Sequence, residues 1–113
     1  MEIFIDLFNR KIKLSEERKK HILERLEMIG QEHKITETLI NPEFIKRSMS
    51  NKNVNVYYKN YPKTPVTNKY LAVVVKINGE NFVITAYFTD RIKKGDLIWE
   101  KNWIFGLTRK GIF

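Results

Sequence analysis

Two β-rich runs joined by an Asn-Gly pair constrain the fold of this chain more than any other feature. Residues 69–77 and 81–88 are rich in β-branched and aromatic side chains, and Asn78 and Gly79 stand between them. Asn-Gly is the strongest short hairpin signal, because a type I′ turn needs a positive φ at both central positions. The sequence therefore predicts an antiparallel β-hairpin in the second half of the chain.

The turn also predicts which side chains of the hairpin face the interior. A two-residue turn pairs Val75 with Phe82 and Tyr70 with Tyr87, and alternation then separates two faces. The odd-numbered residues of the first run are apolar and are expected to pack on the helices. The opposite, mixed face is expected to be exposed; it carries Tyr70, Ala72, Val74, Lys76, Asn81, Val83, Thr85 and Tyr87, and Thr89 continues it.

A helix is predicted near the start of the chain. Ser15 is a suitable N-cap, and Glu16 and Glu17 follow in the first turn, where acidic side chains favour the helix dipole. Four apolar residues then recur at helical spacing: Ile22, Leu23, Leu26 and Ile29. The helix is expected to end at Gly30.

The segments on either side of this helix are predicted from shorter signals. Residues 3–13 are expected to form a short strand or an irregular arm, and a second helix is expected at residues 35–40. Pro42 breaks that helix and is expected to start another turn through Arg47.

Strands dominate the second half. Residues 54–59 alternate like a strand, and the chain from Leu97 onward is expected to add a final one. Helices first and strands afterwards indicate an α+β fold in a single domain of residues 1–113.

The formal charge of +8 is concentrated in the middle of the chain. Residues 1–40 carry eight basic and eight acidic side chains, whereas residues 41–76 carry seven basic side chains against Glu43 alone. A clustered positive field attracts phosphate backbones, so RNA is the expected partner. The alternative is that the charge serves only solubility.

Composition excludes several classes of site. The chain has no cysteine, which excludes disulfides, thiolate zinc sites and a cysteine nucleophile. It shows neither a signal peptide nor an apolar run long enough to span a membrane, so a cytoplasmic protein without a membrane partner is expected.

Tyrosine and lysine side chains gather on the face of the hairpin that we expect to be exposed. Tyrosines stack on unpaired bases and lysines hold phosphates, a combination suited to single-stranded RNA. The expected RNA-contacting surface carries Tyr57, Lys59, Tyr70, Lys76, Thr85 and Tyr87. The alternative is that these residue types are simply good exposed strand residues.

His21 is the candidate for acid–base chemistry. In the predicted helix it lies away from the apolar stripe, with Glu17 and Glu24 as neighbours. It is either a surface histidine paired with Glu17, or a general acid or base acting on a ribose 2′-hydroxyl or a leaving oxygen. His33 is expected to lie in a solvated loop.

Other chemistries find little support in the sequence. No convergent set of histidine and carboxylate ligands predicts a metal site, and the five glycines are too scattered for a phosphate-binding loop. The inventory therefore favours a reaction without metal or cofactor.

The runs ITETLINPEFIKRS, VYY, KYLAVVVK and FVITAYFTDRIKKGD resemble small bacterial and phage-associated proteins of the barnase–EndoU–colicin–RelE-like toxin-nuclease superfamily. The resemblance covers roughly residues 14–99 and leaves residues 100–113 as a C-terminal extension. Its landmarks are His21, the block at residues 37–42, and the Thr-x-Tyr-Phe-Thr-Asp run at residues 85–90.

The resemblance implies a metal-independent endoribonuclease with two N-terminal helices packed on a four-stranded antiparallel sheet. It implies an RNA substrate such as tRNA or ribosome-associated mRNA, and an acidic antitoxin or immunity protein as a partner. His21 would be the acid–base residue, and the other expected catalytic residues are Arg47, Lys59, Lys76 and Thr85. The expected substrate-binding residues are Tyr57, Lys69, Tyr70, Tyr87 and Thr89.

The chain also departs from the superfamily pattern. Arg18, Lys19 and Lys20 stand where an aromatic residue of the first helix is usual, which leaves a non-catalytic binding module as the alternative. Binding to a protein instead of a nucleic acid would be favoured by an exposed aromatic patch, for which the candidates are Trp99, Trp103, Phe105 and Phe113.

Overall fold

The structure, a computed structural model, describes residues 1–62 and 70–101. These residues form one seven-stranded sheet with two α-helices, α1 (Glu16–Leu23) and α2 (His33–Ile40), and a short 3₁₀ helix, η1 (Leu26–Met28). The strands are β1 (Glu2–Ile5), β2 (Lys11–Leu14), β3 (Phe44–Ser48), β4 (Val54–Asn60), β5 (Tyr70–Lys76), β6 (Phe82–Thr89) and β7 (Gly95–Glu100). The predicted α+β fold class is confirmed.

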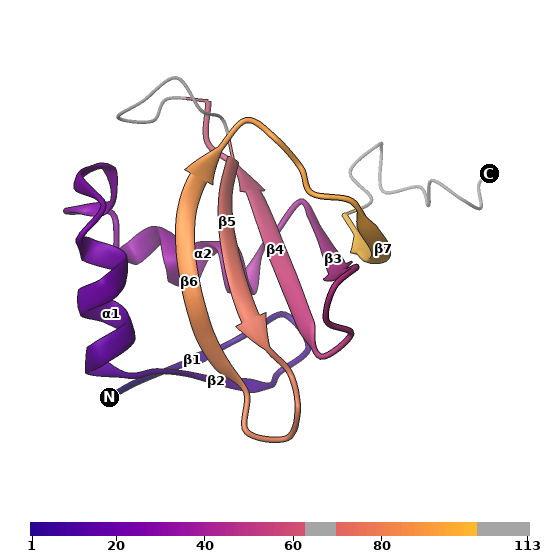
Figure 1. The fold of residues 1–113 in the computed structure, drawn as a ribbon, viewed down its shortest axis with the longest axis horizontal. Coiled ribbons are helices and arrows are strands. Elements are labelled where there is room, and N and C mark those ends of the chain that lie inside the picture. The colour runs from indigo at the N-terminus through magenta and orange to yellow at the C-terminus, as the bar shows by residue number, and fades with distance from the viewer. Residues whose placement is uncertain (63–69, 102–113) are drawn as a thin grey trace.

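The strand order is β1-β2-β6-β5-β4-β3-β7. All neighbours are antiparallel except β2 and β6, which meet in parallel where Lys13 lies opposite Phe82. Figure 1 shows the sheet face-on, with α2 behind it and α1 beside β6. The four-stranded expectation is therefore only roughly matched, because an N-terminal hairpin and the β3–β7 pair widen the sheet.

The main core lies between the helices and the face of the sheet on which α2 packs. α1 packs against β6, and α2 packs against β5, β4 and β1. The buried residues of this core are Ile12, Leu14, Ile22, Met28, Ile35, Leu39, Ile45, Tyr57, Leu71, Val73, Val75, Val83, Ala86 and Phe88. Burial of Ile12 and Leu14 makes residues 3–13 an integral hairpin rather than a loose arm.

The first helix starts as predicted but ends early. Ser15 Oγ accepts a hydrogen bond from the backbone N–H of Arg18 at 3.1 Å, which satisfies one free donor of the first turn. The helix stops at Leu23, and Leu26 and Ile29 are 81% and 59% exposed. Extension of the stripe to Gly30 was wrong, because η1 turns the chain and buries Met28 instead.

Two other predictions before the hairpin have different outcomes. The helix expected at residues 35–40 is confirmed as α2, which begins slightly earlier, at His33. The turn expected after Pro42 was wrong, because residues 44–48 form β3. Antiparallel partners on both sides, β4 and β7, decide this conformation, and they bury Ile45 completely.

The predicted hairpin is present as β5 and β6, but its turn is longer than two residues. Gly79 has a positive φ of 105°, and Asn78 does not share it, so the turn is not type I′. The residues flanking the turn use their backbone groups elsewhere: the Ile77 N–H donates to Asn53 O, and Asn81 O accepts from Lys13 N–H. The strands therefore close at Lys76 and Phe82.

The longer turn shifts the register without exchanging most of the faces. Tyr70 lies opposite Thr89, two residues from the predicted partner Tyr87, and a shift by two keeps each side chain on its face. An irregularity between Val74 and Val75 changes the alternation near the turn. For this reason Val83, which was expected on the exposed face, is buried in the main core.

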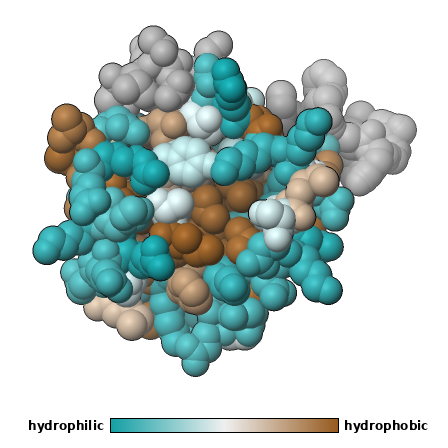
Figure 2. Space-filling model, viewed as in Figure 1, coloured by the Kyte–Doolittle hydropathy of each residue, from teal (hydrophilic) through white to brown (hydrophobic). Residues whose placement is uncertain are grey.

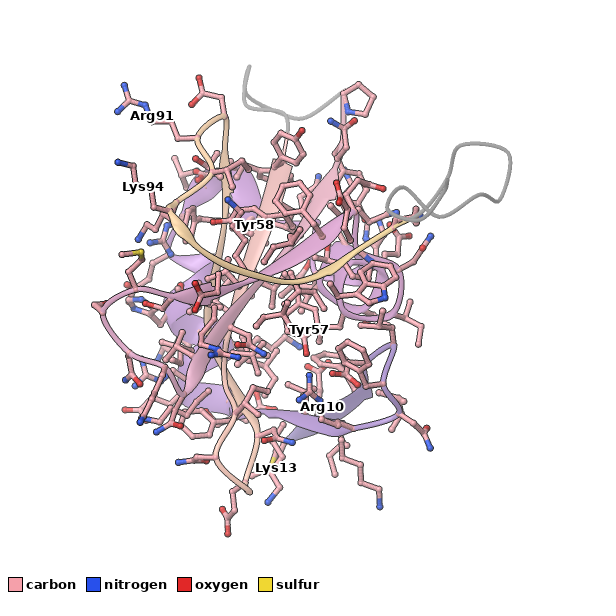
Figure 3. The ribbon with its side chains drawn as sticks, turned by 90° about the vertical axis from the view of Figure 1, so that its right-hand side faces the viewer. Arg10, Lys13, Tyr57, Tyr58, Arg91 and Lys94 are labelled. Atoms are coloured by element: carbon pink, nitrogen blue, oxygen red, sulfur yellow. The ribbon has the colours of Figure 1, made fainter. Side chains whose placement is uncertain are left out.

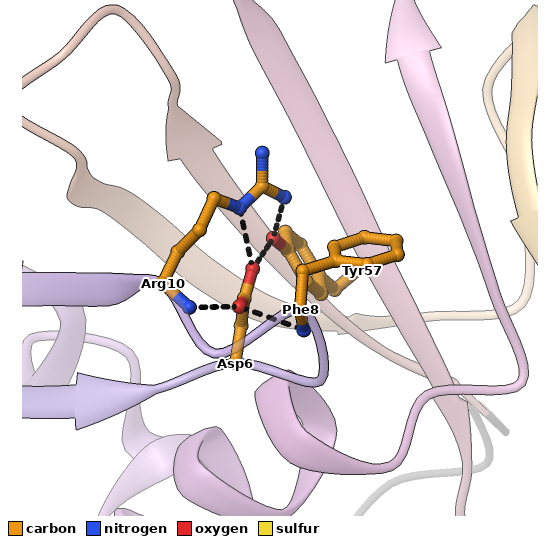
Figure 4. Close-up of polar contacts among 4 residues, drawn as sticks. All are labelled: Asp6, Phe8, Arg10 and Tyr57. Atoms are coloured by element: carbon orange, nitrogen blue, oxygen red, sulfur yellow. Dashed lines mark hydrogen bonds and ion pairs between the residues drawn. The ribbon is translucent and has the colours of Figure 1, made fainter.

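A buried polar cluster ties the β1–β2 turn to the middle of β4 (Figure 4). The Asp6 carboxylate accepts hydrogen bonds from the backbone N–H groups of Phe8 and Arg10, at 3.0 and 2.8 Å. It also accepts one from Arg10 Nε at 2.9 Å and one from the Tyr57 hydroxyl at 2.6 Å. Arg10 Nη2 in turn donates to the Tyr57 hydroxyl at 2.9 Å.

Tyr57 is therefore a core residue, and its expected place on the exposed face was wrong. Its side chain is fully buried. Burial raises the pKa of its hydroxyl, and the hydrogen bond to the Asp6 carboxylate raises it further. The neighbouring Tyr58 takes the opposite face, because strand side chains alternate.

Among the described residues, no helix is long and apolar enough to cross a membrane.

Candidate nucleic-acid interface

The sheet face opposite α2, here called the open face, carries a second and smaller apolar cluster. Val56, Tyr58 and Ala72 are its buried members. Its partly buried members are Phe44, Tyr70, Val74, Tyr87 and Ile92. Figure 2 shows this face as a hydrophobic centre surrounded by hydrophilic side chains.

The connection from β6 to β7, residues 90–94, crosses this face. β7 pairs with β3, so the connection has to pass β5 and β4 on its way from β6. Ile92 packs on the apolar cluster, and the Lys93 backbone N–H donates to the Tyr58 hydroxyl at 3.2 Å. Figure 3 shows Arg91 and Lys94 of this connection projecting outward.

The open face is hollowed into a pocket of about 400 Å³. Val54, Val56 and Val74 form its apolar floor, and Tyr58 and Tyr87 border it. Tyr58 is fully buried, and burial raises the pKa of its hydroxyl. Tyr87 is only half-buried, so it is the aromatic side chain that a ligand in the pocket can touch.

The remaining walls of the pocket are basic. Lys46 and Arg47 come from β3, and Lys93 and Lys94 come from the β6–β7 connection. Within the described residues, Arg47 alone among these four has a carboxylate at ion-pair distance, Asp96 at 3.8 Å, and that pair is exposed. Exposed pairs of this kind contribute little, so the walls keep a positive field over an apolar floor.

Arg25 adds a fifth cation from the β6 side. It follows α1, and its Nη1 donates to Thr85 Oγ1 at 3.1 Å. Its guanidinium carbon lies 5.5 Å from the centre of the Tyr87 ring, within cation–π distance. No carboxylate among the described residues pairs with it. These contacts draw the side chain over the edge of β6 onto the open face.

Sequence reasoning missed Arg25, Lys46, Lys93 and Lys94 as binding residues. The basic run at residues 91–96 is visible in the sequence, but only the crossing of the sheet brings it over the pocket. Arg25 falls one position beyond the helix cap at Glu24, so helical periodicity does not indicate its direction.

The structure brings only some of the predicted site residues together. Arg47 and Tyr87 line the pocket, Thr85 lies opposite Val74, and Lys76 lies opposite Val54 at the lower end of the same face. Thr89 lies opposite Tyr70, and its hydroxyl accepts a hydrogen bond from the Arg91 N–H at 3.0 Å.

Two other predicted residues lie outside the basic pocket, although Tyr70 belongs to the apolar cluster of the open face. Lys59 and Tyr70 line a separate hollow of about 550 Å³ with Glu43 and Asn60, and Lys59 Nζ donates to Asn41 O at 3.1 Å. The shared surface expected for Lys59, Tyr57 and the hairpin face was therefore wrong. Lys69 lies outside the described residues.

His21 is separated from the basic pocket. Its side chain is 51% exposed, and Nδ1 lies 3.8 Å from the Glu24 carboxylate, rather than beside Glu17. It lines a hollow of about 430 Å³ that is made of α1 and the cap residue Glu24 and shares no residue with the basic pocket. The expectation that His33 lies in a loop was wrong, because His33 is the first residue of α2.

Of the four aromatic residues expected in a patch for a protein partner, only Trp99 lies within the described residues, and it is not exposed. Trp99 is partly buried and packs against the main core. Trp103, Phe105 and Phe113 lie outside the described residues. Within residues 1–62 and 70–101, no group of three or more histidine and carboxylate side chains is placed to hold a metal ion.

Comparison with known proteins adds no match: no family model, no curated protein and no solved structure matches this chain. The resemblance to toxin nucleases therefore stays a prediction.

Proposed function

We propose that this protein binds single-stranded RNA on its open face. The observation that carries the proposal is the pocket itself, in which Lys46, Lys93 and Lys94 surround an apolar floor. Phosphates are attracted by the cations, and unpaired bases present apolar faces that pack on valine and tyrosine. An RNA strand supplies both kinds of group along its length.

A single strand suits this surface better than a duplex. Bases in a duplex are stacked and paired, and their faces are not available to a protein pocket. The pocket is concave and holds about 400 Å³, whereas recognition of a duplex relies on backbone contacts across its grooves.

The test is fluorescence anisotropy of a labelled ten-nucleotide RNA with wild type and the double variant Lys93→Ala/Lys94→Ala. The matched control is Lys11→Ala/Lys20→Ala, which removes the same charge from exposed positions on β2 and α1. Loss of two phosphate contacts should make the negative slope of log K against log salt shallower by about 1.4, because each contact to a single strand contributes about 0.7 to its magnitude. Equal weakening by the control pair would refute binding at the open face.

Metal-independent cleavage of the bound strand is the second candidate. Several cations around one site are suited to the negative charge that develops on the phosphoryl oxygens. In this step a ribose 2′-hydroxyl attacks phosphorus, gives its proton to water and displaces the 5′-oxygen of the next nucleotide, which takes a proton from water. His21 lines a different hollow, so this candidate assigns charge stabilisation to the pocket and no proton transfer to His21.

Incubation with total tRNA and with ribosomes in EDTA tests this second candidate. If the protein cleaves RNA, the activity should survive His21→Ala and be lost in Lys93→Ala/Lys94→Ala. Loss of cleavage in His21→Ala would contradict the assignment and return the proton-transfer role to α1. Binding without cleavage in any buffer would leave RNA binding as the function.

A further inference from the structure

The arrangement of cations across the open face indicates the path that a bound strand would follow. Arg25 lies beside β6, the valines of the floor lie on β5 and β4, and Lys46 and Arg47 lie on β3. Neighbouring strands are about 4.8 Å apart, so β6 and β3 are separated by roughly 14 Å. Cations therefore flank the apolar floor on both sides, along a line across the strands.

The composition of the floor excludes a phosphate from the centre of this line. Val54, Val56 and Val74 offer no hydrogen-bond donor, and a phosphate placed over them would lose its hydration without compensation. A flat apolar group fits there, against the half-buried Tyr87. The volume of about 400 Å³ lies at the small end of ligand pockets, which range over about 300–1,000 Å³.

We propose that the pocket receives one unpaired nucleobase of an RNA strand that crosses the β-strands. The phosphates on either side of that nucleotide lie on Arg25 at one end and on Lys46 at the other, because Lys46 lies opposite Val56 on the open face, whereas Arg47 lies opposite Asn55 on the face of Tyr57. Lys93 and Lys94 line the pocket from the β6–β7 connection and contact further phosphates of the same strand. This inference rests on the proposed RNA binding, and it adds the position of one base and the path of the strand.

Arg25 has a second role in this arrangement. Its guanidinium lies over the Tyr87 ring and is hydrogen-bonded to Thr85, while its other N–H groups have no carboxylate partner among the described residues. Arginine presents five donors in a fixed plane, so it can hold Tyr87 in place and bind a phosphate at the same time. Arg25→Lys keeps the charge and loses this double contact.

The decisive measurement compares wild-type binding of an intact ten-nucleotide RNA with binding of the same strand carrying abasic positions. Both strands carry the same phosphates, so charge is constant and only bases are removed. Loss of the inserted base should weaken binding by about tenfold or more, since one stacked base contributes a factor of this order. Equal affinity for both strands would overturn the base site and leave RNA binding intact, whereas no affinity for either would refute the proposed function as well.

A filled pocket provides an independent test. Val74→Trp extends a half-buried side chain of the floor into the pocket, and it should weaken binding of the intact strand while leaving the abasic strand unaffected. Asn60→Trp is the control, because it introduces the same side chain at an exposed position of the separate Lys59 hollow. If circular dichroism shows that Val74→Trp does not fold, the comparison of strands with wild type decides alone.

Free adenosine monophosphate distinguishes a strand from a small ligand. It has one phosphate and cannot bridge Arg25 to Lys46, so it should compete with the ten-nucleotide RNA at least a hundredfold more weakly than unlabelled RNA does. Competition at equal concentrations would overturn the proposed path of the strand and assign the pocket to a free nucleotide. Arg25→Lys should lower RNA affinity several-fold; unchanged affinity would remove Arg25 from the site.

Discussion

The buried hydroxyl of Tyr57 offers the most direct test of how the sheet is held together. Tyr57→Phe removes one oxygen that donates to Asp6 at 2.6 Å and accepts from Arg10 at 2.9 Å. The Asp6 carboxylate keeps its bonds to the N–H groups of Phe8 and Arg10, so the change does not leave a buried charge without partners.

The expected loss follows from this geometry. A hydrogen bond to a charged group contributes about 1.5–3 kcal/mol, so Tyr57→Phe should lower the free energy of unfolding by about 2 kcal/mol at pH 7. With a denaturant slope of about 2 kcal/mol/M, the urea midpoint should fall by about 1 M. Urea titrations followed by far-UV circular dichroism measure this shift.

Tyr58→Phe is a matched control from the next position in the chain. Its hydroxyl accepts one hydrogen bond, from the neutral N–H of Lys93 at 3.2 Å, and it lies on the opposite face of the sheet. The expected loss is about 0.5–1 kcal/mol. A cost for Tyr58→Phe as large as that for Tyr57→Phe would refute the reasoning, because it would show that the carboxylate partner contributes nothing.

The pH dependence provides a second signature of the same contact. Burial and the bond to Asp6 raise the pKa of Tyr57 above the usual tyrosine value of about 10, so the fold favours the neutral hydroxyl. A raised pKa in the folded state contributes stability that is complete below about pH 10 and is lost as pH rises toward the folded pKa. The stability gap between wild type and Tyr57→Phe should therefore narrow above pH 10. A gap that stays constant to pH 11 would contradict this account.

Two further substitutions test the strand edge and the helix end. A methyl group on Gly95 would lie 2.0 Å from the Arg47 carbonyl oxygen, so Gly95→Ala should separate β7 from β3. It should lower the free energy of unfolding by about 1–3 kcal/mol. Lys94→Ala is the control and should change it little, and thermal melts of both variants measure the difference. Leu26→Ala should change stability by less than about 0.5 kcal/mol because Leu26 is 81% exposed, whereas Met28→Ala should cost about 2–5 kcal/mol. If urea titrations showed a larger loss for Leu26→Ala than for Met28→Ala, the result would support a continuous helix to Gly30 instead of η1.

The sequence by itself determined the elements that depend on local chemistry. The hydroxyl at Ser15 starts α1 because an N-cap acts within one turn of the chain. Away from its turn, the β5–β6 hairpin kept its apolar and mixed faces because alternation is a property of each strand, even though its register moved there by two residues. The basic character of the middle of the chain was visible from composition alone.

Only the tertiary structure decided the features that depend on distant partners. Residues 44–48 became a strand because β4 and β7 supply hydrogen bonds on both sides. Tyr57 lies in the main core instead of on the expected exposed face because Asp6 and Arg10, about fifty residues away, bind its hydroxyl. Alternation separates two faces of an isolated strand without indicating which one is covered.

The candidate site belongs to the same group of features. Arg25 reaches the open face through Thr85, and Lys93 and Lys94 reach it because the β6–β7 connection crosses the sheet. None of these residues is close in sequence to Lys46 and Arg47, so no local pattern joins them. Composition predicted a phosphate-binding surface; the strand order determined where its cations meet the apolar floor.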